Sequence, residues 1–163
     1  MSIVSEALQD REFGVAPLET LKAMSGLEFL QALLEGRLPA PPITRTLGFV
    51  LSEVSEGRAL FRAEPSFDHY NPIGSVHGGW AATLLDSCMG CAVQSTLPQG
   101  SGYTTLEFKI NLVRGMTDKT GPVEAEGTIV QSGRRVGVAE GRLTDAAGRL
   151  LAFGTTTCLI FPL

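Results

Sequence analysis

Asp86 lies nine residues after His77, which is followed directly by two glycines. This spacing could place an acid and backbone hydrogen-bond donors on one helix. Asp86 lies in the otherwise apolar segment Ala81–Ala92, which follows the Pro- and Gly-rich turn Asn71–Trp80. A helix that is apolar on nearly every side is normally buried. A buried carboxylate is costly unless it is paired, hydrogen-bonded or used in chemistry. Asp86 is therefore the first candidate for a catalytic group.

The two glycines at the expected helix start could supply hydrogen-bond donors. If the helix begins near Gly78, Asp86 lies about two turns in, at ~3.6 residues per turn. The N–H groups of Gly78 and Gly79 then point out of the helix N-terminus, where the dipole favours an oxyanion. Asn71 and His77 flank the same turn and offer polar side chains. These five residues predict an oxyanion site next to an acid.

Each of these residues also has an ordinary structural interpretation. The glycine pair could form a tight turn before a helix, and His77 could be a capping or core histidine. Asp86 could be a buried carboxylate satisfied by the backbone or by a partner chain. One site that uses all of these residues is favoured over separate structural roles, because it accounts for the whole set at once.

The composition limits the classes of function. The 163 residues fit one domain with a substantial core. Acidic residues number 17 against 13 basic, a net charge of −4, which gives no electrostatic basis for nucleic-acid binding. The sequence shows no apolar run long enough to span a bilayer and no signal-peptide pattern at Met1–Glu6, so we expect a cytoplasmic protein without a membrane partner.

The three cysteines form no disulfide framework, because their number is odd. Cys88 and Cys91 match Cys-x-x-Cys, but they fall about ten residues into the expected helix, away from the N-terminus that acidifies redox thiols. No second pair with zinc spacing completes a metal site. We therefore interpret all three, Cys158 included, as small buried residues and expect no metal.

Two regions differ in their hydrophobic pattern. Residues 1–42 carry leucines at helical spacing, and Pro39, Pro41 and Pro42 are expected to stop this N-terminal helical extension. The main domain is expected over residues 43–163, with a strand period from Thr44. Two short strands, at 47–51 and 57–63, should precede a central helix that ends near residues 97–100. Four strands should follow, at 104–113, 123–132, 135–145 and 149–161. This order predicts an α+β fold, with an antiparallel sheet wrapped on a long helix.

The motif residues resemble those of one known family. Asn71-Pro-x-Gly-x-x-His77-Gly-Gly, Asp86 nine residues after His77, and Tyr103-Thr104-Thr105-Leu106-Glu107 are similar to the hot-dog-fold acyl-CoA thioesterases of the phenylacetate-degradation-like (PaaI-type) family. The resemblance runs from about Pro41 to the C-terminus and includes Gly133-Arg134-Arg135 and Thr155–Cys158.

This resemblance implies hydrolysis of an acyl-CoA thioester without a metal or redox cofactor. Asp86 would be the nucleophile or the base that activates water, and the N–H of Gly78 would polarise the thioester carbonyl. Asn71 and His77 would orient the carbonyl or the water. Thr105 would help to position the water. Acyl transfer needs an activated oxygen and a preformed oxyanion site, and one helix offers both.

Further residues are expected to bind the substrate, and a second copy is expected to complete the site. Gly79 and Thr104 are candidates beside the catalytic set, and Arg134 and Arg135, at a turn that begins at Gly133, are candidates for the coenzyme A phosphates. Open sheet edges predict that copies of the chain pair with one another. The family resemblance implies a homodimer, or a homotetramer built as a dimer of dimers, with the site shared between subunits. A hydroxyacyl-thioester dehydratase, a non-catalytic acyl-CoA-binding protein and a purely structural oligomer are the alternatives.

Overall fold

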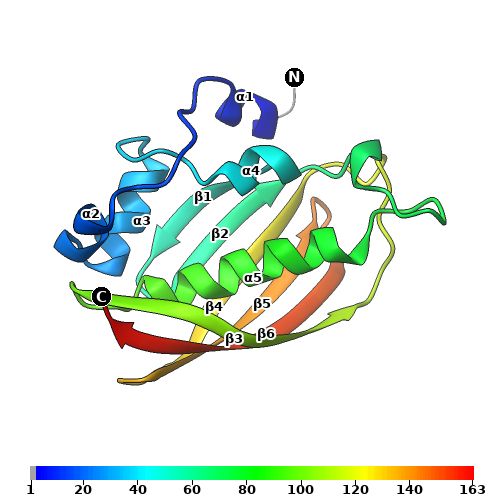
Figure 1. The fold of residues 1–163 in the computed structure, drawn as a ribbon. Coiled ribbons are helices and arrows are strands. Elements are labelled where there is room, and N and C mark those ends of the chain that lie inside the picture. Colours follow the sequence, from blue (N-terminus) through cyan, green and yellow to red (C-terminus); the bar gives the residue numbers. More distant parts are fainter. Residues whose placement is uncertain (1–2) are drawn as a thin grey trace.

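The computed structural model describes residues 3–163, with four short helices ahead of a long helix and a sheet (Figure 1). The elements follow in the order α1 (Ile3–Gln9), α2 (Leu18–Ala23), α3 (Gly26–Leu34), α4 (Pro42–Leu47), β1 (Phe49–Ser55), β2 (Arg58–Ala63), the 3-10 turn η1 (Phe67–His69), α5 (Gly78–Gln94), β3 (Ser101–Leu112), β4 (Val123–Ser132), β5 (Val136–Asp145) and β6 (Leu150–Pro162). No helix within these residues is long and apolar enough to cross a membrane.

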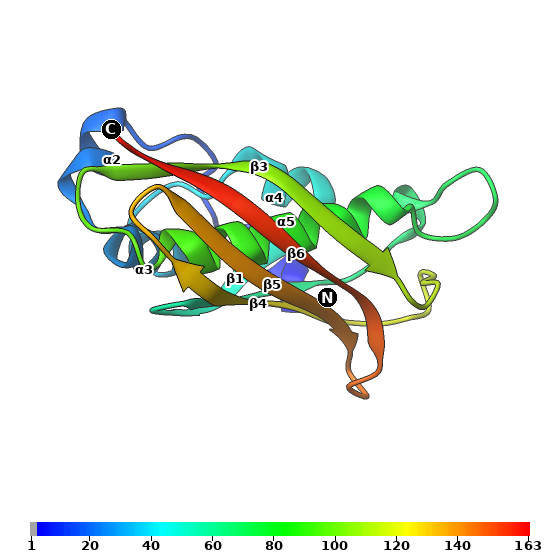
Figure 2. The same ribbon diagram turned by 90° about the horizontal axis from the view of Figure 1, so that it is seen from below.

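All six strands form one antiparallel sheet that curves around α5. The strand order is β1-β2-β4-β5-β6-β3. Seen from below, β5 and β6 lie in front of α5 and cross it obliquely (Figure 2). This confirms the predicted α+β fold with the sheet wrapped on a central helix.

The helix α5 forms the core with the concave face of the sheet. Its fully buried side chains include Leu84, Leu85, Cys88 and Met89. On β4, Gly127 faces the backbone of α5 so closely that a Cβ there would collide with the carbonyl of Cys88. Glycine at this position lets α5 pack directly on the sheet, and this contact fixes the height of the helix above the strands.

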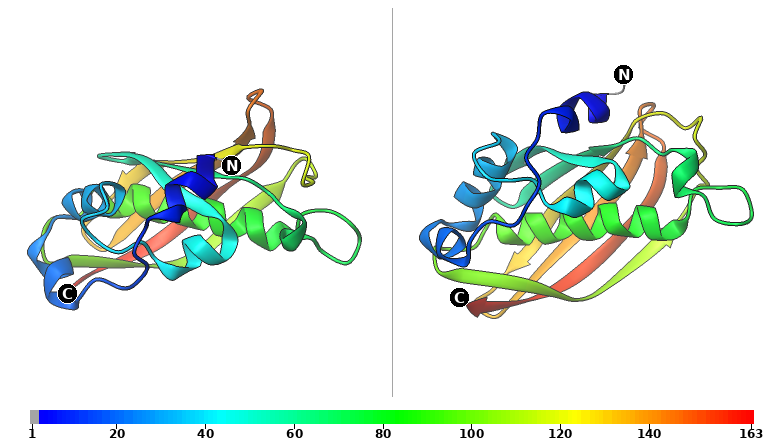
Figure 3. Two further views of the ribbon diagram at one scale, coloured as in Figure 1. Left: turned by 90° about the horizontal axis from the view of Figure 1, so that it is seen from above. Right: turned by 45° about the horizontal axis from the view of Figure 1, so that its top comes forward.

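The four N-terminal helices lie over the side of α5 that the sheet leaves open. Figure 3 shows these blue and cyan segments above one flank of the green α5. Ser25 and Glu28 form a capping box that begins α3, with the Ser25 N–H donating to Glu28 at 2.8 Å. α1, α3 and α4 all contact β1. The amphipathic helices expected in the N-terminal extension are thus present.

One expectation for this region is wrong. The change of period at Thr44 predicts extended chain and a strand over residues 47–51, yet Pro42 begins the helix α4, Thr44 lies buried within it, and β1 starts only at Phe49. A proline at the first helical position loses no hydrogen bond, because its N–H would have no partner there. The helix ends at Gly48, which has a left-handed conformation (φ 64°) and lets the chain turn into β1.

The two edges of the sheet differ. Helices contact β1, whereas β3 is a 12-residue edge strand that exposes apolar side chains. Leu106 is 58% exposed, Phe108 41% and Leu112 57%. A long apolar edge strand is a template for pairing with another chain.

Candidate active site

The turn before α5 is held together by the side chain of Asn71. Its Oδ1 accepts hydrogen bonds from the N–H groups of Ile73 (3.1 Å) and Ser75 (3.2 Å), and its Nδ2 donates to Ser75 Oγ at 3.1 Å. An amide that accepts from backbone N–H groups two and four residues on stabilises a tight turn. In a single chain Asn71 therefore shapes the loop that leads to His77, and its contact with substrate remains a prediction.

His77 is the N-cap of α5. Its Nδ1 accepts a hydrogen bond from the N–H of Gly79 at 2.8 Å, which places the ring proton of the neutral form on Nε2. The expectation of a free donor at Gly79 is thus wrong, because the histidine cap uses that N–H. The N–H of Gly78 makes no hydrogen bond within residues 3–163. Gly78 is the donor that remains available at the positive end of the helix dipole.

Asp86 is fixed by a neighbouring strand. Its Oδ1 accepts a hydrogen bond from Thr105 Oγ1 on β3 at 3.0 Å, and both side chains are half-buried. Its other oxygen, Oδ2, has no hydrogen-bond or ion-pair partner in the part of the chain that the structure describes. One carboxylate oxygen is therefore held, while the second can act on a ligand.

Gly78 and Asp86 are too far apart to act on one carbonyl within a single chain. They are eight positions apart on α5, which is ~12 Å along the axis at ~1.5 Å per residue. A reacting atom must lie about 3 Å from both the nucleophile and the oxyanion donors. A site that uses both groups on one carbonyl would thus need them from different copies of the chain.

The structure separates the remaining candidates from this pair. Thr104 is exposed, and alternation along β3 directs it to the face opposite Thr105. The turn at Gly133–Val136 joins β4 to β5 at the C-terminal end of α5, where Ser132 lies 2.7 Å from Thr96. Arg134 is exposed there and makes no ion pair among the described residues. Arg135 is exposed at the same turn. Roles in substrate binding for these residues remain predictions.

A second histidine, His69, lies beside the site and was not predicted from the sequence. His69 stacks on Trp80 with ring centroids 5.1 Å apart, and its Nδ1 accepts from the N–H of Ser66 at 3.0 Å. Its carbonyl also accepts the N–H of His77 at 2.8 Å. Burial lowers the pKa of His69, an effect that the charge of Asp68 partly opposes. The only available signal was the position of His69, two residues before Asn71.

Tyr103 was also missed as a neighbour of Asp86. Its hydroxyl lies so close to Gly90 that a Cβ there would be 2.9 Å away. Burial raises the pKa of Tyr103 well above its usual range, and the nearby Cys91, Cys158 and Asp86 raise it further. The phenol is therefore neutral, and its hydroxyl lies against Gly90, about one turn after Asp86 on α5.

The cysteines have the character expected from their position. Burial raises the pKa of the thiols of Cys88, Cys91 and Cys158, in the case of Cys91 to about 12. All three are free in the structure; Cys88 and Cys158 are buried as expected, whereas Cys91 is only partly buried. Protonated thiols are poor nucleophiles, which agrees with the interpretation of these residues as structural and not redox-active.

Comparison with known proteins relates this chain to a family. The chain matches the family model of the thioesterase superfamily over residues 73–152, a span that includes Gly78, Asp86 and Thr105. A Halobacterium salinarum protein that is named as an esterase is 32% identical to this chain over 114 residues. The aligned region covers 67% of this chain and 74% of the relative.

Solved structures share the fold. A phenylacetic acid degradation-related protein from Ralstonia eutropha is 28% identical with a TM-score of 0.73, over 80% of this chain and 98% of that one. A mutant of the phenylacetic acid degradation protein PaaI from Thermus thermophilus is 26% identical with a TM-score of 0.65, over 72% and 97%. A Streptococcus mutans protein with bound acetyl-CoA is 25% identical with a TM-score of 0.64, over 70% and 89%. These likenesses confirm the expected hot-dog fold.

Proposed function

This chain belongs to the thioesterase superfamily, and on that premise we propose that it hydrolyses acyl-coenzyme A thioesters to a free acid and coenzyme A. The observation that carries the proposal is the hydrogen bond from Thr105 to Asp86, which holds the carboxylate on α5 and leaves Oδ2 open. The acetyl-CoA held by the Streptococcus mutans relative supports an acyl-CoA ligand.

Asp86 supplies the activated oxygen. As a general base, it takes a proton from a water whose oxygen attacks the thioester carbonyl carbon; the carbon–sulfur bond then breaks and the coenzyme A sulfur takes up the proton. As a nucleophile, its Oδ2 forms the bond to carbon, the thiolate leaves, and water hydrolyses the resulting anhydride. Thr105 orients the carboxylate in both routes.

The N-terminus of α5 supplies the oxyanion site. The Gly78 N–H donates to the carbonyl oxygen as negative charge develops on it, at the positive end of the helix dipole. His77 keeps this donor in place through its bond to the Gly79 N–H. The Nε2–H of His77, which is exposed at the same turn, offers a second donor to the substrate or to water.

Two copies of the chain build each site. The ~12 Å between Gly78 and Asp86 along α5 supports a site in which one subunit gives the donor and the other gives the carboxylate. The apolar edge strand β3 supports pairing of two copies, and β3 also carries Thr105. We propose a homodimer, or a dimer of dimers, with Asp86 facing the partner's Gly78.

The test is a panel of acyl-CoAs incubated with purified protein, with released thiol as the readout. Asp86→Asn keeps the volume of the side chain and removes its charge, so it should lower the rate by about 10²- to 10⁴-fold. Glu140→Gln, a matched change of an exposed carboxylate on β5, should retain the parent rate. An acyl-CoA that binds without thiol release would indicate a binding protein, and water loss from a hydroxyacyl-CoA would indicate a dehydratase.

A further inference from the structure

The phenol of Tyr103 lies on the same strip of the molecule as the proposed catalytic carboxylate. Tyr103 and Thr105 are two positions apart on β3, so alternation directs both side chains to the same face of the strand. Thr105 donates to Asp86 at 3.0 Å. The Tyr103 hydroxyl packs on Gly90, where a Cβ would be 2.9 Å from it. Gly90 follows Asp86 by four positions on α5, which is ~6 Å along the axis and on the same side of the helix.

The Tyr103 hydroxyl has no hydrogen-bond partner within residues 3–163. The other tyrosine, Tyr70, donates its hydroxyl to Asp118 at 2.8 Å. Every fully buried side-chain nitrogen or oxygen of the described chain does have a partner. The unpartnered hydroxyl of Tyr103 is therefore not sealed in the core, and it borders space that a water or a ligand can reach.

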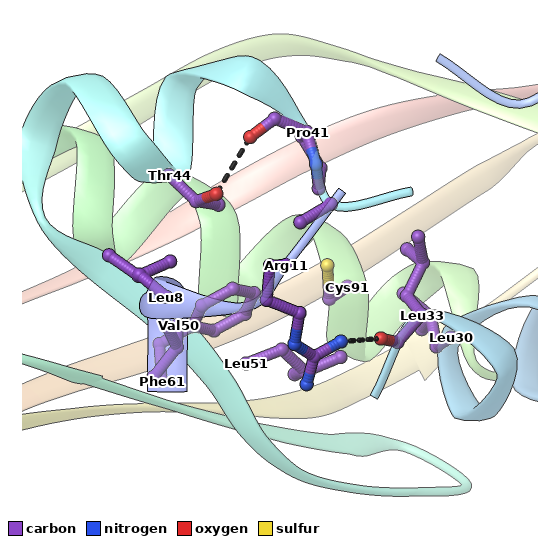
Figure 4. Close-up of a pocket in the computed structure, with 11 residues that line it drawn as sticks. Leu8, Arg11, Leu30, Leu33, Pro41, Thr44, Val50, Leu51, Phe61 and Cys91 are labelled. Carbon is purple, nitrogen blue, oxygen red and sulfur yellow. Dashed lines mark hydrogen bonds between the residues drawn. The ribbon is translucent and has the colours of Figure 1, made fainter. Parts of the chain in front are cut away.

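The thiols near this hydroxyl do not replace a partner. Cys91 lines a small apolar cavity beneath the N-terminal helices, whose wall includes neither Tyr103 nor Asp86 (Figure 4). The thiol of Cys158 lies 3.9 Å from Thr105 Oγ1. Burial raises the pKa of both thiols, and protonated thiols are weak hydrogen-bonding groups. Burial also raises the pKa of the phenol, so its hydroxyl stays neutral and can donate one hydrogen bond to an oxygen of a ligand.

An apolar acyl chain that covered Tyr103 would leave this hydroxyl without a partner. Removal of a hydroxyl from water without a replacement hydrogen bond is unfavourable. With the thioester carbonyl carbon about 3 Å from the carboxylate of Asp86, atoms about two or three bonds further along the acyl chain come within reach of a hydroxyl ~6 Å away along the helix. An oxygen on the third carbon of the acyl group meets this requirement.

We infer that Tyr103 donates a hydrogen bond to an oxygen on the acyl chain, and that it thereby favours 3-hydroxyacyl- and 3-oxoacyl-CoA substrates over unsubstituted acyl-CoAs. The inference rests on the proposed function, since it requires the thioester carbonyl at Asp86. The negative charge of Asp86 disfavours an anionic substituent at the same place. Tyr103 is thus a specificity-determining residue that contacts the substrate.

Tyr103→Phe tests this directly, because it removes the hydroxyl and keeps the ring on Gly90. The readout is the ratio of kcat/KM for 3-hydroxybutyryl-CoA to kcat/KM for butyryl-CoA, followed by released thiol. One neutral hydrogen bond is worth about 2- to 12-fold, so Tyr103→Phe should lower this ratio by that factor. A merely structural role would change both substrates alike. Tyr70→Phe, the same change at a hydroxyl that already has a partner, should leave the ratio unchanged.

Calorimetric titration of non-hydrolysable thioethers separates this inference from the proposed function. Should the parent hydrolyse acyl-CoAs while Tyr103→Phe keeps the parent ratio, the phenol does not contact the acyl oxygen and the inference is overturned. Should no thioester be hydrolysed, the proposed function fails; the hydrogen-bonding role of Tyr103 is still supported if S-(3-hydroxybutyl)-CoA binds more tightly than S-butyl-CoA and Tyr103→Phe abolishes that difference. Equal affinities of the parent for the two thioethers would overturn that role as well.

Discussion

The hydrogen bond between Thr105 and Asp86 gives the sharpest quantitative prediction. Thr105→Val preserves the shape of the side chain and removes the donor that holds Oδ1 at 3.0 Å. A hydrogen bond to a charged group contributes about 1.5–3 kcal/mol. Because Asp86 is half-buried, water screens part of this energy, and we use the lower end of the range. A loss of about 1.5–2 kcal/mol in the transition state lowers kcat by roughly 10- to 30-fold.

An exposed threonine on another strand provides the control. Thr128→Val makes the same chemical change on β4, where the side chain is exposed. Both variants should fold, as judged by circular dichroism. Thiol release at saturating acyl-CoA should then fall only for Thr105→Val, with little change in KM. Equal rates for the two variants would refute the claim that Thr105 positions the carboxylate.

Three further predictions concern the surroundings of the site. Gly127→Ala should lower the free energy of unfolding in urea by about 3 kcal/mol or more, because its Cβ collides with backbone of α5 that cannot yield; a loss below about 1 kcal/mol would contradict this packing. Burial lowers the pKa of His69 below its ordinary 6.5, so the unfolded state binds the proton more readily than the folded state. The stability that neutral His69 contributes is therefore lost as the pH drops below about 6.5. Urea titrations should show that His69→Gln destabilises the protein less at acidic pH than at neutral pH. Joint replacement of Arg134 and Arg135 by Ala should raise KM for acyl-CoA and leave KM for an acyl-pantetheine, which lacks the nucleotide phosphates, unchanged. Equal effects on both substrates would show that these arginines do not bind the phosphates of coenzyme A.

Elements with a strong local pattern could be predicted from the sequence. The strand expected at 123–132 is β4 (Val123–Ser132), and the helix expected from Gly78 begins there. Alternation along a half-buried strand and the turn residues at its ends are local signals. The resemblance implied only that Thr105 helps to position a water; the hydrogen bond from Thr105 to Asp86 was not predicted, because it depends on how β3 lies against α5.

The features that the sequence did not reveal depend on tertiary contacts or on a choice between two local interpretations. Pro42 can end one helix or begin the next, and only the path of the chain over β1 decides. The N–H of Gly79 could face a ligand or the His77 ring, and in the structure it donates to the ring, which caps the helix. The stacking of His69 on Trp80 and the cavity beneath the N-terminal helices depend on contacts between separate elements of the fold. The spacing of apolar residues along the sequence gives no information on such contacts.

Subunit complementation tests the central claim, a thioesterase site shared between two chains. His77 already has the extended conformation (φ −63°, ψ 134°) that a following proline requires, so Gly78→Pro can remove the oxyanion donor at the first helical position without breaking α5. Gly78→Ala, which keeps the N–H and also brings a Cβ against Leu112, controls for that contact.

The measurement mixes inactive Asp86→Asn with inactive Gly78→Pro and follows acyl-CoA hydrolysis as subunits exchange. Each mixed dimer would hold one site with an intact Gly78 and an intact Asp86, so a randomised 1:1 mixture should recover about one quarter of the parent activity. If mass spectrometry shows complete exchange and the mixture stays inactive, the two groups do not act together across the subunit boundary.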